Sequence, residues 1–548
     1  MEEFMPTAKV QEDIVADLAH IVPRVIVHHM KPYKEFKNAV VYHIPHEHTN
    51  EMSTNSEICP LGLHFLNSNK AAEMAQILDD VHSKYVPTVT LDVPVVLDHV
   101  ILDGDQLTEE RARNAQWANS LAGTQAERME GITPGFADWH LKKNFLTICS
   151  KLFFKEGSAG EIGTSCASMN RTGKSNAKKG PDEDYNAYSD FIQHESEAHI
   201  IAKWIAFAGM KDMESSPLTR PIPDITNWDL QTKRDWLYKE MHVFLTEIFQ
   251  RTNLHEKVVI HEQQIHNLIV NDGGDESRDK FGYYKCRGSC SLMFATDATR
   301  KRHESTKHSD VHIMTNPVLE DHTMEQASET DFIYNYHNAR LQFGMLFMNI
   351  VDAIREGDGF RLTRCYKLVI LFAYKFKHTK YAYALLLLFV QTGAVLSEEE
   401  SFCLIMNRFV NVNDKIGRNI PLDLHMEHLN LLLKRLSKGM GSNITTKSLQ
   451  RAARSVVAIN NIMEGIYKDC SKKKKSGSHG SKNPEEAVQI VVKDLLDGKV
   501  FQKTNGRAGY PTFPKFTSNV IDIDYRDFFK WTKDCLNRWK GVYETTKK

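Results

Sequence analysis

Short apolar runs predict strands in the first 155 residues of the chain. Runs bounded by turn residues favour strands at 94–97, 100–102 and 132–137, and two further β-like runs lie at 40–42 and 60–65. Each run is short enough to span one strand of a small sheet.

Helical patterns separate these predicted strands. Apolar residues at 74, 77, 78 and 81 have helical spacing, which predicts a helix over 70–85. A second helix is expected over 109–120 with Thr108 as its N-cap, and a third from 138 through 154. The alternation of strand and helix favours a layered α/β core.

Beyond residue 155 the pattern becomes predominantly helical. The predicted helices lie at 189–210, 233–250, 424–438 and 446–467, with a strongly apolar helical block at 329–395. Residues 157–184 are rich in Gly, Ser, Asn and Lys, and predict a loop. We therefore expect a mixed α/β, helix-rich fold.

The most apolar run, at 381–390, is about half as long as a membrane-spanning helix. We expect it to be a buried core helix, and we expect no membrane association. A segment at 471–483, with Lys472–Lys475 among Ser and Gly, predicts a solvated linker.

Composition narrows the class of protein. A chain of 548 residues should form two or three packed regions, and its net charge of -1 provides no global attraction to nucleic acid. The 9 cysteines are scattered and odd in number, which indicates a reducing, intracellular compartment. The N-terminus has neither the basic nor the apolar region of a signal peptide.

The sequence contains one C2H2-type zinc-binding pattern. Its spacing is C-x3-C-x12-H-x4-H, formed by Cys286, Cys290, His303 and His308. Two thiolates and two imidazoles can close a tetrahedral zinc site between a hairpin and a helix. Phe294 occupies the place where the small core of such a finger needs an aromatic residue. The alternative is a helix with two incidental histidines.

One position of the pattern departs from the usual finger. Three residues before the first histidine stands Arg300, where an apolar residue is usual, so we expect a weakened small core that leans on its host domain. If the module docks on DNA, Thr296, Thr299 and Arg302 would face the bases. A lone finger reads about three base pairs, so structural stapling or protein contact is an equally good interpretation.

Acidic residues follow two of the predicted strands. Asp103 and Asp105 end one strand region and Asp138 follows the strand at 132–137, where α/β folds place their chemistry. Glu427 lies on the first turns of a later helix, with Asp423 four residues earlier on the same face. Such carboxylates could hold Mg²⁺ for phosphodiester chemistry.

Each of these features also has a purely structural interpretation. Asp103-Gly104-Asp105 is typical of a turn, and Glu427 is an acid favoured near a helix N-terminus by the helix dipole. A metal at His46-Glu47-His48 has no convincing set of partner ligands, and a polar loop is the simpler interpretation.

Several sequence blocks together resemble a known family. They are HIPHEHTNEMS at 43–53, PLGLHFLNSNKAAEM at 60–74, GDQLTEERAR at 104–113, GITPGFADWHLKKNF at 131–145 and IPLDLHMEHLN at 420–430. Their order is similar to that in metazoan and fungal proteins that carry the domain of unknown function 6589, often regarded as derived from transposable elements.

This resemblance implies a ribonuclease-H-like core related to cut-and-paste transposases. It implies Asp105 as the second catalytic aspartate, Glu427 as the acid on a later helix, and Asp138 and His140 as flanking residues. The helical insertion would be 157–415. Family members have more chain before the first block, so the core here is expected to lack its first strand, and Asp103 or Asp98 would replace the first aspartate.

These interpretations divide the chain into seven parts. They are an α/β core part at 1–155, a helical region with a basic loop at 156–275, the zinc finger at 276–312, a helical insertion at 325–415, core helices at 416–470, a Lys-rich linker at 471–484 and a tail region at 485–548.

The first functional hypothesis is a transposase-derived, nucleic-acid-associated protein that uses Mg²⁺ to cleave or join DNA. The second is a catalytically inactive, domesticated nuclear protein that binds DNA or protein through the zinc finger and a basic patch of Arg171, Lys174, Lys178 and Lys179. Lys472–Lys475 could serve as a nuclear-import signal. A third is an interaction protein that uses the helices at 329–470. The oligomeric state is left open.

Overall fold

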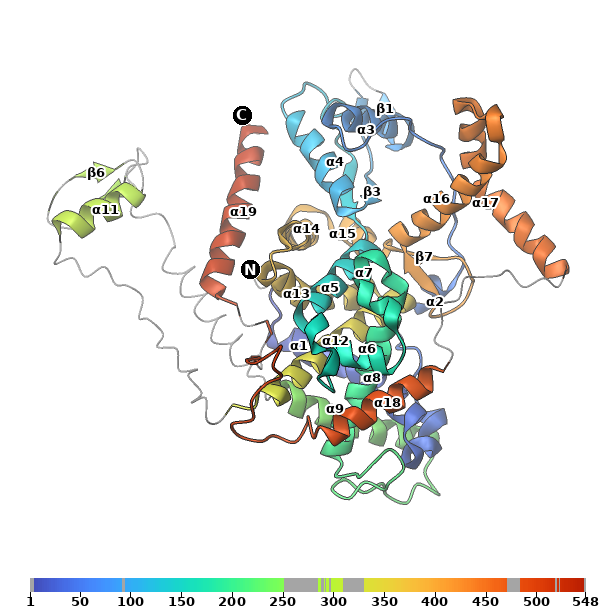
Figure 1. The fold of residues 1–548 in the computed structure, drawn as a ribbon. Coiled ribbons are helices and arrows are strands. Elements are labelled where there is room, and N and C mark those ends of the chain that lie inside the picture. Colours follow the sequence, from blue (N-terminus) through green and yellow to red (C-terminus); the bar gives the residue numbers. More distant parts are fainter. Residues whose placement is uncertain are drawn as a thin grey trace.

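The computed structural model describes residues 4–90, 94–250, 284–286, 290, 292–294, 297–308, 330–470, 483–517, 520–521 and 523–546. Helices form most of this part of the chain (Figure 1). The first group of helices comprises α1 (Ala8–His29), α2 (Thr49–Ser53), α3 (Ala71–Tyr85), α4 (Gln106–Ala118), α5 (Asp138–Phe153), α6 (Ser165–Arg171), α7 (Gly180–Glu183), α8 (Tyr185–Phe207) and α9 (Leu230–Gln250). The second group comprises α11 (Asp297–Lys307), α12 (Phe332–Glu356), α13 (Gly359–Lys375), α14 (Thr379–Val390), α15 (Glu398–Met406), α16 (Leu422–Gly439), α17 (Thr446–Asp469), α18 (Pro484–Asp497) and α19 (Tyr525–Thr546).

The strands described pair in two-stranded sheets. They are β1 (Thr88–Thr90) with β2 (Pro94–Val96), β3 (Val100–Gly104) with β4 (Ile132–Phe136), β5 (Tyr284–Lys285) with β6 (Met293–Phe294), and β7 (Phe409–Asn411) with β8 (Asn419–Pro421). Only β3 and β4 are parallel among these pairs, and α4 makes the connection between them. The mixed, helix-rich class is confirmed at this level.

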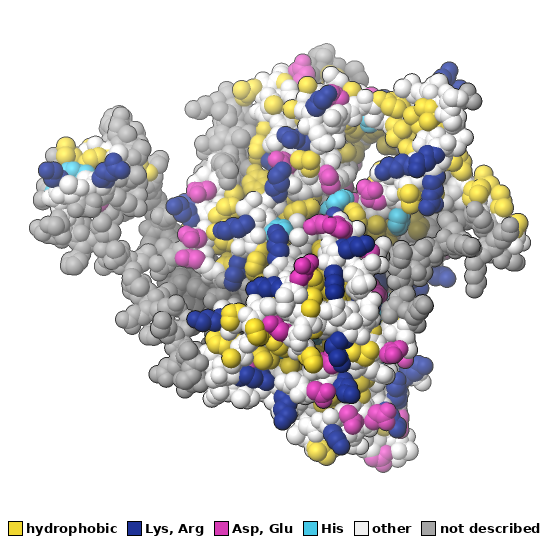
Figure 2. Space-filling view, viewed as in Figure 1, with side chains coloured by type: hydrophobic (Ala, Val, Ile, Leu, Met, Phe, Trp, Pro, Cys, Tyr) yellow, Lys and Arg dark blue, Asp and Glu magenta, His cyan; other side chains and the backbone are white. Residues whose placement is uncertain are grey.

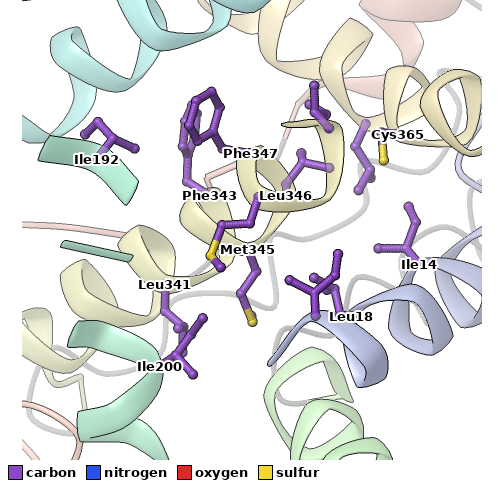
Figure 3. Packing of buried hydrophobic residues seen from close by; sticks show 14 of the residues in the cluster. Ile14, Leu18, Ile192, Ile200, Leu341, Phe343, Met345, Leu346, Phe347 and Cys365 are labelled. Atoms are coloured by element: carbon purple, nitrogen blue, oxygen red, sulfur yellow. The ribbon is translucent and has the colours of Figure 1, made fainter. Parts of the chain in front are cut away.

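The main core lies among the long helices. α12 packs against α8, α13 and α1, and it is buried almost all round because apolar residues occupy nearly every face. Figure 3 shows Leu341, Met345 and Leu346 of α12 between side chains of α1 and α8. A smaller cluster around Met74 and Leu78 joins α3 to α4 and β4.

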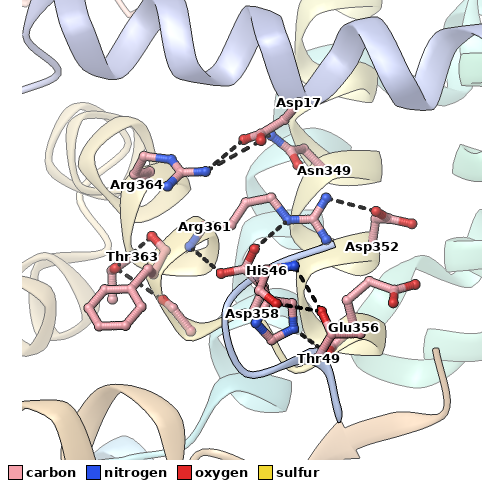
Figure 4. A network of polar contacts seen from close by, with 12 residues as sticks. Asp17, His46, Thr49, Asn349, Asp352, Glu356, Asp358, Arg361, Thr363 and Arg364 are labelled. Carbon is pink, nitrogen blue, oxygen red and sulfur yellow. Dashed lines mark hydrogen bonds and ion pairs between the residues drawn. The ribbon is translucent and has the colours of Figure 1, made fainter. Parts of the chain in front are cut away.

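Ion pairs are buried beside this core (Figure 4). Arg361 is fully buried and donates to Asp352 at 2.8 Å, while Arg364 pairs with Asp17 of α1 at 3.3 Å. A buried guanidinium needs such partners, because an unpaired buried charge is strongly destabilising. The network ties α1, α12 and α13 together.

The early histidine block docks on the end of α12. A ring N–H of His46 donates to the backbone carbonyl of Glu356 at 3.1 Å, and His43 contacts the Glu356 carboxylate at 2.9 Å. These contacts support the structural interpretation of the block at 43–53.

Several predicted elements differ in the structure. The β-like runs at 40–42 and 60–65 form no strand, and the predicted loop at 157–184 contains α6 and α7. Thr164 caps α6 by accepting from the backbone of Ala167, so a polar composition here reflects caps and short helices. The block at 329–395 divides into α12, α13 and α14, the first break being Gly357 at φ 73°.

The apolar run at 381–390 lies within α14, whose residues Leu385, Leu386 and Leu388 are buried, as the sequence predicted. In the part of the chain described, no helix has the length and apolar character needed to cross a bilayer.

Candidate metal centre and carboxylate site

Parallel pairing brings the acids after β3 and β4 to one edge. The register places Asp103 opposite Gly135 and Gly104 opposite Phe136, so Asp105 and Asp138 both follow the carboxyl ends of paired strands. α16 packs on β3 and on α5, which adds the acids of its first turns to the same edge.

Asp423 binds the start of α5 and the ring of His140. Its carboxylate accepts the backbone N–H groups of Trp139 and His140, each at 3.0 Å, and His140 Nδ1 at 2.9 Å. It therefore acts as an N-cap supplied by another helix. Burial alone would raise the pKa of Asp423, but these hydrogen bonds hold it below its usual value.

His140 is the point on which the acids converge. The hydrogen bond that His140 donates to Asp423 raises the pKa of His140, and the charges of Asp105 and Glu427 act in the same direction against burial. Asp105 from the end of β3 and Glu427 from α16 thus both influence one imidazole ring.

Asp105 is the N-cap of α4. Its Oδ1 atom accepts the backbone N–H of Thr108 at 2.8 Å and the Thr108 hydroxyl at 2.7 Å. The prediction that Thr108 caps this helix was wrong, because the helix begins at Gln106, three residues before Glu109. Asp is a strong N-cap residue, so the Asp-Gly-Asp turn and the helix start are one feature.

Asp103 is an acid in an unfavourable place. Its Oδ1 is shielded from solvent without a hydrogen-bond partner, and a Cβ atom at Gly135 would lie 2.2 Å from it. Burial raises the pKa of Asp103 to about 7, with Asp138 and Asp423 adding to the shift and Arg408 opposing it. This carboxyl group therefore exchanges a proton near neutral pH.

Asp138 is sealed inside the protein. It is 0% exposed, it pairs with the Arg408 guanidinium at 2.6 Å, and it accepts the Tyr366 hydroxyl at 2.6 Å. Arg408 also donates to the carbonyl of Phe136, at the end of β4. Asp138 thus lies at the predicted strand end, but its oxygens are taken by protein groups.

Glu427 lies one turn of α16 beyond Asp423 and is exposed. Tyr381 of α14 completes the surroundings, because burial first, and then the charges of Asp105 and Asp423, raise the pKa of its hydroxyl to about 12. Asp105 and Glu427 therefore lie near enough to His140 for their charges to raise its pKa, whereas Asp138 is fully buried and paired with Arg408. Arg408, Tyr366 and Tyr381 were missed, since no spacing in the sequence connects them to the strand ends.

The predicted zinc ligands meet at a second place. The ligand atoms of Cys286, Cys290, His303 and His308 all lie within 4.8 Å of one another, and this group could hold a metal ion. Among the described residues it is the only group of three or more that is drawn together in this way.

The donor set suits a metal. Cys290 Sγ lies 3.2 Å from His303 Nε2, and His308 Nε2 is shielded without a hydrogen-bond partner. A hydrogen bond from the backbone of Leu292 is the main cause that lowers the pKa of the Cys290 thiol to about 6. Phe294 packs on the His303 ring at 4.9 Å, in the position that the sequence predicted.

Arg300 changes the small core of this unit in an unexpected way. It is 5% exposed, its guanidinium lies 5.3 Å from the centre of the Tyr284 ring, and Glu304 beside it is 0% exposed. α11 packs on β5 and β6. A cation–π contact thus supplies packing inside the unit, and the expectation that the finger leans on its host domain stays a prediction.

The predicted nucleic-acid contacts are only partly available. Arg171 pairs with Asp494 at 2.5 Å and Lys174 pairs with Asp190, so half of the predicted basic patch is neutralised. Lys178, Lys179, Thr299 and Arg302 are exposed, whereas Thr296 and Lys472–Lys475 lie outside the described residues.

Comparison with known proteins places the chain in a family. No curated protein and no solved structure matches it. Residues 1–479 match the family of unknown function DUF6589, which agrees with the resemblance carried by the five sequence blocks. The match covers the β3–β4 edge, α16 and the Cys/His group, and the chain belongs to this family of unknown function, DUF6589.

Proposed function

We propose that the protein is a transposase-derived, nucleic-acid-associated protein whose carboxylate site cleaves or joins phosphodiester bonds with Mg²⁺. The supporting observation is that acids from the end of β3 and from the first turns of α16 act on the single ring of His140. A ribonuclease-H-like core would place its acids at strand ends and on a later helix in this way.

Two acids of the site have oxygens left for a metal. The hydrogen bonds of Asp105 go to Oδ1, which leaves Oδ2, and Glu427 is exposed. Asp103 offers the third oxygen, Oδ1, which lacks a partner. Asp105, Glu427 and, once deprotonated, Asp103 would supply oxygens to Mg²⁺, whose chemistry is to lower the pKa of water and stabilise charge on phosphate oxygens. Their oxygens are not drawn together within 4.8 Å as the Cys/His ligand atoms are, so Mg²⁺ would have to bring them closer.

The remaining groups orient and transfer protons. Asp423 fixes His140 through Nδ1, so Nε2 is the ring atom left for a phosphate oxygen. Asp103, with a pKa of about 7, can accept or release a proton at neutral pH. Asp138 and Arg408 support the strand end and are positioning residues.

The test is a supercoiled-plasmid nicking assay in Mg²⁺ and Mn²⁺ with Asp105→Asn and Glu427→Gln. Asn retains the capping function, so Asp105→Asn keeps α4 intact. Asp229→Asn is the matched control, since Asp229 also caps the third following backbone N–H, that of Thr232, at 2.7 Å.

Metal-dependent nicking that is lost in both site variants and kept in the control is the expected result. Absence of metal-dependent nicking in the unaltered protein would refute the cleavage proposal.

A second candidate is a catalytically inactive, nucleic-acid-binding or protein-binding protein. It is favoured by the structural tasks of the acids: Asp105 caps α4, Asp138 neutralises Arg408, and both oxygens of Asp423 accept hydrogen bonds. These acids would then be retained because the fold needs them, without any catalytic role. Binding to DNA without any nicking would support this candidate.

In either case we propose that the Cys286 group binds one Zn²⁺ as a structural site, as two thiolates and two imidazoles do in zinc fingers. Thr299 and Arg302, which are exposed on α11, would then face DNA bases. A role on DNA would place the protein in the nucleus.

A further inference from the structure

The hairpin of α16 and α17 carries a strong local excess of positive charge. Residues 428–463 contain no Asp or Glu, although the whole chain has 70 acidic and 69 basic residues. The basic residues of this stretch are all exposed, and they are Lys434, Arg435 and Lys438 on α16 and Lys447, Arg451 and Arg454 on α17.

Three of these six cations line one groove. Arg435 from α16 and Lys447 and Arg451 from α17 line a shallow groove between the two helices. None of the six cations forms an ion pair with another described residue. Figure 2 shows Lys and Arg side chains gathered over this hairpin, next to exposed hydrophobic side chains. Like charges that share a groove repel one another unless an anion lies between them.

Helix stability does not account for the cations on α17. Cations stabilise the C-terminal end of a helix and are unfavourable near its N-terminal end, because of the helix dipole. Lys447 lies in the first turn of α17, and Arg451 follows one turn later. The dipole therefore disfavours the charge of Lys447, whereas Arg451 lies beyond the first turn, where the effect of the dipole has fallen off.

The hairpin is also continuous with the carboxylate site. α16 begins beside His140 with Asp423 and Glu427 and continues to Lys434 and Arg435. At 1.5 Å per residue, Lys434 lies about 10 Å further along the helix than Glu427. One helix thus joins the proposed reaction site to the basic groove.

We propose that the groove between α16 and α17 binds the phosphate backbone of a DNA duplex and directs it towards the carboxylate site. This inference rests on the proposed association with nucleic acid. Arg435 and Arg451 would contact phosphate oxygens with two N–H groups, Lys447 would act as a point charge, and the contacts would be independent of base sequence.

The experiment measures binding of a labelled DNA duplex to the full chain between about 50 and 200 mM salt. The groove variant is Arg435→Gln, Lys447→Gln, Arg451→Gln. The control removes the same charge from exposed lysines outside any predicted nucleic-acid contact: Lys37→Gln, Lys239→Gln, Lys503→Gln. A third variant, Arg435→Lys, Lys447→Arg, Arg451→Lys, keeps the charge in the groove.

Loss of three phosphate contacts should reduce the slope of log K against log salt by roughly 3 and raise Kd roughly 100-fold near 0.1 M salt. The control and the charge-retaining variant should bind within a few-fold of the unaltered protein. Circular dichroism of each variant checks that the helices are retained.

Three results would overturn the proposal. If the unaltered protein binds no duplex, the association with nucleic acid fails as well. If it binds and the groove variant binds equally well, only the groove assignment fails. If the groove variant keeps duplex binding but loses binding to phosphatidylserine vesicles, the surface recognises lipid instead.

Discussion

Replacing Asp138 by Asn should destabilise the protein strongly, because it removes the counter-charge of a buried guanidinium. Asp138 and Arg408 are 0% and 1% exposed, and they are joined by hydrogen bonds of 2.6 and 3.0 Å. Breaking a buried pair from one side costs about 3 to 5 kcal/mol. The carbonyl of Phe136 still accepts from Arg408, so we expect the lower half of this range.

The measurement is urea unfolding followed by circular dichroism. Arg408→Met alone should also be destabilising, because the Asp138 carboxylate would then be buried with only Tyr366 to donate to it. The double variant Asp138→Asn, Arg408→Met should recover much of the lost free energy, since replacing both partners of a buried pair is often neutral.

The outcome separates a structural acid from a catalytic one. A loss of less than about 1 kcal/mol in Asp138→Asn, or losses that simply add in the double variant, would refute the reasoning. Asp138 would then have to be considered again as a residue that contacts a substrate or metal.

Three further predictions concern single groups. Asp103→Asn should raise the free energy of unfolding at pH 8 by up to about 4 kcal/mol, because the charged Asp103 carboxylate is destabilising at that pH. The raised pKa means that Asp103 favours folding below pH 4, and this contribution is lost between pH 4 and 7. The same dependence of stability on pH in the variant and in the unaltered protein would contradict the burial of Asp103. Burial lowers the pKa of His199 to about 3, so this ring is protonated more easily in the unfolded chain than in the folded protein. The free energy of unfolding should therefore fall by about 2 kcal/mol between pH 7.5 and pH 5 because of His199, and unfolding curves of His199→Gln should lack this loss. Mass spectrometry should find one zinc per chain, and none in Cys286→Ser; zinc retained in that variant would rule out the predicted ligand set.

The sequence predicted the elements that carry the carboxylate site well. Strand 132–137 corresponds to β4, helix 138–154 to α5, and helix 424–438 to α16, and no end differs by more than two residues. These elements have clear apolar periodicity and local start signals. The four ligands of the metal centre were predicted because their spacing is a local property of the sequence.

The contacts that give each acid its task could not be predicted in this way. Asp138 and Arg408 are 270 positions apart in the chain, and Asp423 reaches its partners across 283 and 284 positions. No local pattern records which distant arginine will neutralise a buried aspartate. The groove between α16 and α17 was missed for the same reason, since its cations meet only after the two helices pack together.

Some charged residues of the site are explained by the fold and others are not, and the unexplained ones indicate where a ligand would bind. Asp105, Asp138 and Asp423 each satisfy a helix end or a buried cation, so the fold explains their presence. The carboxylate of Asp103 is destabilising because its Oδ1 is shielded without a partner, and Lys447 opposes its own helix dipole. A charged residue that lowers stability is retained when it binds a ligand. A buried carboxylate is the group that a metal ion would use, and exposed cations are the groups that a phosphate backbone would use. Their position on and beside α16 suggests that both would serve the same substrate.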